Sequence, residues 1–208
     1  MRVWTNVIGR ALVSGTIASI TSAAALVLLA RAEGKNALQP VNATSHWLHG
    51  EQASRFVGLD CKHTLVGYAT HHAATIFWAL FYESWIGPRS RPSRRRMLAD
   101  AVMLSAIAAA VDYGPTPKRF TPGWEFVLSK RAMAAAYAAM AVGLAAGSSI
   151  THRRRISRAS RIDPVHPWFS RVRGQAYDRN SSQHPSQSRR RQLGDRDASP
   201  APASMRRG

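Results

Sequence analysis

His71 and His72 are the side chains with the most chemistry to offer, because they lie inside an uncharged run of 19 residues from Thr64 to Tyr82. Ionisable groups inside apolar spans are rare, and they mark proton paths, metal sites or haem ligands. The alternative is a neutral imidazole hydrogen-bonded to a neighbouring helix, which we favour because a neutral ring is cheaper to bury than a charge. Neighbours on a helix point about 100° apart, so one helix cannot build a metal site from this pair alone.

Asp112 closes another apolar run and has two candidate sets of partners. Lys118 and Arg119 follow it in a stiff loop with three prolines, and we favour an ion pair with one of them at the water interface. The alternative is a contact with His71 or His72 across a helix bundle, which would fix a tautomer or pass a proton.

His46 and His49 are three residues apart, so they share one face if Thr44 or Ser45 caps a short helix. That spacing could serve a metal, but no His-x-x-x-His motif or acidic partner completes a ligand set. We therefore expect Trp47 and the two histidines to form an amphipathic turn at the level of the lipid headgroups.

Other chemistry finds little support in the 208 residues. Cys61 is the only cysteine, which excludes an intramolecular disulfide scaffold and a cysteine-based zinc finger. The sequence contains no Gly-x-Ser-x-Gly, no His-Glu-x-x-His and no phosphate loop. We expect no enzyme activity, no cofactor and no bound metal.

Four apolar segments must position these side chains. They are predicted as membrane-spanning helices at about residues 8–30, 64–85, 97–114 and 131–151, each close to the roughly 20 residues that cross a hydrocarbon core. The third contains Asp100 and Asp112, but both lie near its ends, where headgroups and water can solvate them. The first could instead be a signal peptide cleaved near Arg31, although its uncharged run of 20 residues exceeds a usual apolar core of ~7–15 residues.

Arginine and lysine decide the orientation. With four spans, the N-terminus, the loop 83–96 and the tail share one side and carry 21 Lys and Arg, against 8 in the two loops on the other side. We therefore place the protein in the inner membrane as a multi-pass protein with both termini in the cytoplasm. The histidines and Asp112 then belong to its outer half.

Small residues at four-residue spacing predict close helix packing, which is what holds helices together in lipid. The alternative is that an alanine-rich chain produces such ladders by chance. We expect an all-α fold, an integral membrane antiparallel four-helix bundle formed by residues 1–151. The ladders are Gly15, Ser19 and Ala23 in the first span, Ala106, Ala110 and Gly114 in the third, and Ala135, Ala139, Gly143 and Gly147 in the fourth.

Residues 152–208 form a basic tail that we expect to be disordered, because it holds 14 arginines and too few apolar residues to bury a core. Its first cluster should attract anionic lipid headgroups. Nucleic-acid binding is disfavoured, since aromatic interleaving and a recognised binding fold are missing. The lipid-facing arginines of that cluster are Arg153, Arg154, Arg155, Arg158 and Arg161.

Several polar segments resemble a group of small, uncharacterised four-span bacterial inner-membrane proteins. The segments are residues 42–48, 67–72, 111–113, 116–119 and 121–123, and the resemblance covers about residues 5–150. It implies a location in the inner membrane and directs attention to the polar outer segments. It implies no activity and assigns no role to any residue.

These observations predict a small inner-membrane protein of structural or accessory type, in contact with the lipid bilayer and with a second copy or another membrane protein. The alternative is a carrier for protons, metal ions or small solutes that uses His71, His72 and Asp112. Whether those side chains converge on a cavity separates the two.

Overall fold

The computed structural model describes residues 2–86, 89 and 92–162. By its contacts the chain divides into Met1–Ala159 and Ser160–Gly208, and the architecture below is that of the first unit. Residues 163–208, which hold most of the expected tail, lie outside the described residues.

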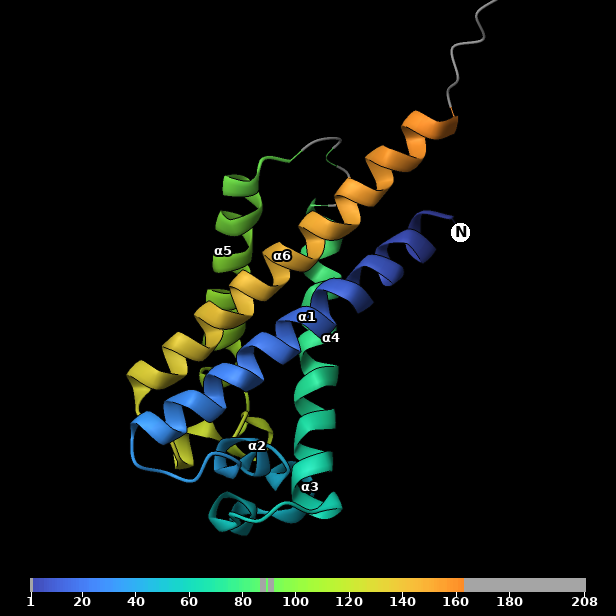
Figure 1. Cartoon of the computed structure of the whole chain (residues 1–208). Coiled ribbons are helices and arrows are strands. Elements are labelled where there is room, and N and C mark those ends of the chain that lie inside the picture. The colour runs from blue at the N-terminus through green and yellow to red at the C-terminus, as the bar shows by residue number, and fades with distance from the viewer. Residues whose placement is uncertain (1, 87–88, 90–91, 163–208) are drawn as a thin grey trace, which may run out of the picture. The chain divides into compact units, whose positions relative to one another are not determined.

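Four long helices form the fold: α1 (Arg2–Ala32), α4 (Val66–Ile86), α5 (Arg94–Tyr113) and α6 (Lys130–Ile162) (Figure 1). The described residues contain no strand, so the expected all-α class and four packed helices are confirmed. Each helix covers an expected span, and α6 continues through the first basic cluster to Ile162. Ser93 begins α5, because its hydroxyl accepts a hydrogen bond from the backbone N–H of Arg96 at 3.2 Å.

Short helical turns connect the long helices at one end of the bundle, where Figure 1 shows α2 and α3. We call residues 33–65 and 114–129 the cap. The first segment holds α2 (Gln39–Ala43), α3 (His46–His49), the 3-10 turn η1 (Glu51–Arg55) and the π-helical turn η2 (Cys61–Leu65). The second holds the 3-10 turns η3 (Lys118–Phe120) and η4 (Trp124–Phe126).

Neighbouring long helices run antiparallel, as paired contacts along them show. On α1 and α4, Ser22 meets His71 while Arg10 meets Glu83. On α5 and α6, Asp112 meets Tyr137 and Met97 meets Ser149. The start of α1, the end of α4, the start of α5 and the Ser149 turn of α6 therefore share one end of the bundle, and the cap occupies the other.

Glycines set the distance of α1 from its neighbours. A methyl group at Gly143 or at Gly147 of α6 would lie 2.5 Å from a Cα atom of α1, that of Ala18 or Ser14. A methyl group at Gly15 would lie 2.8 Å from the Cα of Ile76 in α4. Such approaches leave no room for a side chain, so the expected ladders on α1 and α6 do form packing faces at these positions.

The expected ladder on α5 does not pack inward, because Ala106, Ala110 and Gly114 are exposed. The buried face carries Asp100 and Ser105 instead, together with Ala101 and Ala108. Asp100 finds arginine partners on the inward face, so on this helix a polar contact and not the small-residue spacing marks the buried side.

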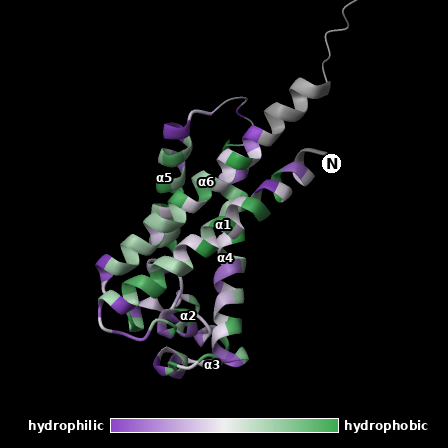
Figure 2. Cartoon of the chain, in the orientation of Figure 1, coloured by the Kyte–Doolittle hydropathy of each residue, from purple (hydrophilic) through white to green (hydrophobic). Residues whose placement is uncertain are grey.

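The bundle buries polar side chains and exposes large apolar ones. Figure 2 shows hydrophilic positions within α4 and at the start of α5. Two helices in the described part of the chain, Trp4–Ala32 and Lys130–Arg153, are long and apolar enough to cross a membrane, a criterion that a core helix of a soluble protein can also meet. The buried polar side chains of the long helices include Ser14, Ser19, Ser22, His71, Thr75, Glu83, Asp100, Ser105 and Ser148, and the exposed apolar ones include Leu12, Ile20, Leu28, Phe77, Phe81, Trp85, Val102, Met103, Ile107 and Val142.

Replacing Gly143 by Leu should lower the free energy of unfolding by about 1–3 kcal/mol, because the new side chain overlaps the α1 backbone. Reversible unfolding in mixed micelles, followed by circular dichroism, measures this. Ala138→Leu is the matched control, since Ala138 is an exposed residue of the same helix. Equal stability of the two variants would contradict the close contact of α1 with α6.

Candidate functional site

A cavity of about 600 Å³ lies between α4, α5 and α6 and the cap. Its volume falls within the range of small-molecule sites in proteins, roughly 300–1,000 Å³. Clefts of this size are where proteins commonly bind small molecules, so it is a candidate for a functional site. The lining consists of Thr44, Trp47, Thr70, His71, Ala73, Ala74, Thr75, Phe77, Trp78, Val111, Asp112, Thr116, Phe120, Pro122, Trp124, Tyr137 and Met140.

Aromatic rings form a large part of the wall. Trp47 and Trp124 come from the cap, and their indole N–H groups donate to protein acceptors, the Thr121 carbonyl at 2.7 Å and the Thr44 hydroxyl at 3.2 Å. Phe77 and Phe120 are about half exposed and belong to the rim. The indole donors are thus used to hold the wall together.

His71 is the buried histidine of this cavity. Its Nε2 lies 3.0 Å from the hydroxyl of Ser22, which donates its own proton to the Ala18 carbonyl at 2.7 Å. The Ser22 oxygen therefore accepts, and the network assigns the proton of the ring to Nε2. The Ser19 carbonyl at 3.4 Å is consistent with that tautomer. His71 thus bonds to a neighbouring helix, as the favoured interpretation of the sequence held.

Asp112 lines the same cavity but has a different partner from either expectation. Its carboxylate accepts a hydrogen bond of 2.6 Å from the Tyr137 hydroxyl of α6. Within the described residues, neither Lys118 nor Arg119 forms an ion pair with it, and no bond joins it to His71. The favoured ion pair was therefore wrong: the loop carries its basic side chains elsewhere, while a phenol of the facing helix reaches the carboxylate.

The other predicted histidines lie apart from the cavity. The ring of His72 stacks on Tyr68 with centroids 5.9 Å apart. His46 is buried inside the cap, with Nδ1 2.9 Å from the Ala43 carbonyl and Nε2 3.2 Å from the Lys118 carbonyl. His49 faces His63 at 5.4 Å between centroids. Of the five predicted site residues, only two thus line the cavity, and the described residues hold no group of three or more His, Cys, Asp or Glu that could bind a metal.

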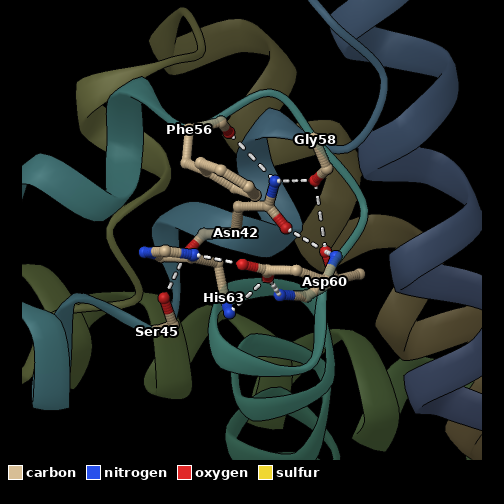
Figure 3. A network of polar contacts seen from close by, with 7 residues as sticks. Asn42, Ser45, Phe56, Gly58, Asp60 and His63 are labelled. Atoms are coloured by element: carbon tan, nitrogen blue, oxygen red, sulfur yellow. Dashed lines mark hydrogen bonds and ion pairs between the residues drawn. The ribbon is translucent and has the colours of Figure 1, made fainter.

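Asn42 fixes the cap that roofs the cavity (Figure 3). Its side-chain amide donates to the carbonyls of Phe56 and Gly58, both at 2.9 Å, and its carbonyl accepts from Thr64 at 2.7 Å. One buried side chain thereby ties α2 to the loop before η2. Because Thr44 and Trp47 follow α2 directly, the network also sets two residues of the cavity wall.

Asp60 begins the helical run into α4. Its carboxylate accepts from the backbone N–H of His63 at 2.7 Å and from the His63 ring at 2.9 Å. Burial opposes ionisation, but these bonds and the nearby His63 outweigh it and lower the pKa of Asp60 below its usual value. The carboxylate is therefore charged at neutral pH and acts as an N-cap for the first turn.

A second polar site lies at the other end of the bundle. The Arg10 side chain of α1 forms an ion pair of 3.3 Å with the carboxylate of Glu83 in α4, which is fully buried. This ion pair ties α1 to α4 at a buried position of the bundle. The sequence analysis did not predict this pair; opposite charges at matching ends of antiparallel helices were the available signal.

Removing Glu83 alone should cost about 3–5 kcal/mol of stability, because Arg10 would remain buried without its partner. The double variant Arg10→Met/Glu83→Leu should recover most of that loss. Unfolding in mixed micelles for the Glu83→Leu, Arg10→Met and double variants forms a double-mutant cycle. Additive losses would show that the two side chains do not depend on each other.

The predicted basic cluster begins where the described side chains end. Arg153 is exposed at the far end of α6, while Arg154, Arg155, Arg158 and Arg161 have a helical backbone and side chains outside the described set. Another basic pair is visible at the same end of the bundle: Arg89 and Arg96 reach Asp100 of α5 at 3.5 and 3.2 Å.

Comparisons with known proteins do not assign the chain. No protein-family model, no curated protein and no solved structure matched it. The cavity and its side chains therefore carry the functional argument.

Proposed function

We propose that the chain is a four-span inner-membrane protein, with both termini in the cytoplasm, that binds a small solute in the cavity of its outer half. The cavity is the observation that carries the proposal: about 600 Å³, aromatic walls, and His71 and Asp112 at one space. A purely accessory role gives no reason for such a space beside the ionisable groups of the bundle.

Membrane location is supported by the inverted distribution of side chains. Phe77, Phe81 and Trp85 lie exposed along α4, while His71 and Glu83 of the same helix are buried. In water this arrangement would leave a large apolar surface uncovered. In lipid the same arrangement places the apolar side chains against the acyl chains and buries the ionisable groups inside the bundle. This argument adds α4 and α5 to the two helices that qualify by hydropathy.

The metal branch of the sequence-based alternative is not part of the proposal, because the described residues hold no group of three or more His, Cys, Asp or Glu that could bind a metal. The solute branch is retained. Three aromatic residues of the wall come from the cap or α6 and were not predicted, namely Trp47, Trp124 and Tyr137. The isolated Tyr137 within an alanine-rich helix was the one signal that the sequence offered.

Cys61 tests the orientation, since it is exposed in the cap and is the only thiol of the chain. A membrane-impermeant maleimide should label it in spheroplasts, where the outer face of the inner membrane is accessible. The variant Cys61→Ser/Arg95→Cys places the thiol at the opposite end and should react only after permeabilisation. The reverse pattern would overturn the proposed topology.

Filling the cavity tests the binding function. Ala74→Phe should weaken solute binding at least tenfold, because a ring would occupy the space that Ala74 lines. Equilibrium dialysis of the full chain in a nonionic detergent measures binding of three benzyl probes of similar size: benzyltrimethylammonium, neopentylbenzene and benzylsulfonate. Ala69→Phe is the matched control on the exposed face of α4. The proposal fails if no probe binds, or if Ala74→Phe leaves the binding unchanged.

A further inference from the structure

The charged side chains of the cavity lining are acidic only. Asp112 contributes a carboxylate to the lining, and no Lys or Arg lines the space. Glu125 of the cap acts electrostatically on Asp112, so a second carboxylate is close by. Within the described residues neither carboxylate forms an ion pair with a basic side chain. A carboxylate withdrawn from bulk water without a cation is costly, and a bound cation would relieve that cost.

The partners of Asp112 and Glu125 are neutral hydroxyls. Tyr137 donates to Asp112 at 2.6 Å, and Thr121 donates to Glu125. Hydroxyl donors stabilise a carboxylate but leave its charge in place. A ligand in the cavity therefore meets an acidic side chain that, within the described residues, no basic side chain pairs with.

The aromatic walls also favour a positively charged ligand. The Tyr137 hydroxyl donates to Asp112, the Trp124 ring lies 5.4 Å from the Tyr137 ring at 55°, and all three residues line the cavity. Aromatic faces carry negative partial charge and attract cations, most strongly when these are desolvated. The indole N–H groups of Trp47 and Trp124 donate to protein acceptors. They are thus not free to bind an anion.

We propose that the cavity binds a monovalent organic cation, a quaternary or protonated amine with an apolar substituent. Asp112 provides the counter-charge and the aromatic walls enclose the cation and its substituent. A neutral solute of the same shape would leave the carboxylate unpaired, and an anion would be repelled by both the carboxylate and the ring faces. This inference rests on the proposed function and specifies its ligand class.

The three benzyl probes separate charge from shape, because benzyltrimethylammonium and neopentylbenzene differ in one atom, nitrogen against carbon. Dialysis of the unaltered full chain should give at least tenfold tighter binding of the cation than of the neutral or the anionic probe. Equal or tighter binding of neopentylbenzene or benzylsulfonate would overturn the inference. The comparison needs no variant, so it decides the inference even where a substitution impairs folding.

Variants then assign the charge to Asp112. Asp112→Asn keeps an acceptor for Tyr137 and should lose the preference for the cation, whereas Asp112→Glu should keep it. Glu51→Gln removes one negative charge from an exposed position of the cap and should leave the affinity unchanged. A cation preference that survives Asp112→Asn would also overturn the inference.

The same dialysis distinguishes failure of the inference from failure of the proposed function. If binding depends on Ala74 but shows no charge preference, the cavity is still a binding site and only the inference of an organic cation fails. If none of the three probes shows binding that depends on Ala74, both the proposed function and the inferred ligand class fail.

Discussion

The close contact of α1 with α4 and α6 is the constraint on which the rest of the structure depends. Gly15, Gly143 and Gly147 bring helix backbones so near that a methyl group would overlap a Cα atom. At that distance only small side chains fit between the helices, and α1 supplies Ser14, Ser19 and Ser22 there. His71 of α4 then reaches the Ser22 hydroxyl and the Ser19 carbonyl of α1, and Glu83 of α4 reaches Arg10. Packing and polar satisfaction are thus two results of one contact.

The cavity follows from the opposite side of the same helices. Where α4 and α6 turn away from α1, they carry Trp78, Tyr137 and Met140, and the cap adds Trp47 and Trp124. Large rings hold helices further apart than glycines do, and rigid indoles held by hydrogen bonds at their edges cannot collapse inward. The bundle is therefore tight along α1 and open along the space that α4, α5 and α6 share with the cap.

Sequence patterns predicted those features that depend on one helix at a time. Four apolar segments gave four helices, and the spacing of Gly143 and Gly147 gave a real packing face. The pattern was misleading on α5, where Asp100 and Ser105 turned the Ala106 face outward. Sequence patterns could not predict three contacts: the partner of Asp112, the bonds of His46 inside the cap, and the ion pair of Arg10 with Glu83. Each joins two segments, and a local pattern does not say how two segments are rotated relative to each other. The cavity has four contributors, so no single period could reveal it.

The carboxylates at the two ends of the bundle have different partners, and this difference bears on which ligand the cavity can bind. At the end away from the cap, Glu83 meets Arg10, while Asp100 meets Arg89 and Arg96. At the cap end, Asp112 meets Tyr137, and Glu125 meets Thr121. A lack of basic residues near Asp112 does not explain the difference, since Lys118 and Arg119 lie only a few residues from it in the sequence. The carboxylates at the first end pair with arginine, whereas Asp112 pairs with a hydroxyl beside a space that a small solute could fill. In a medium of low dielectric constant, that combination favours a ligand that brings a positive charge.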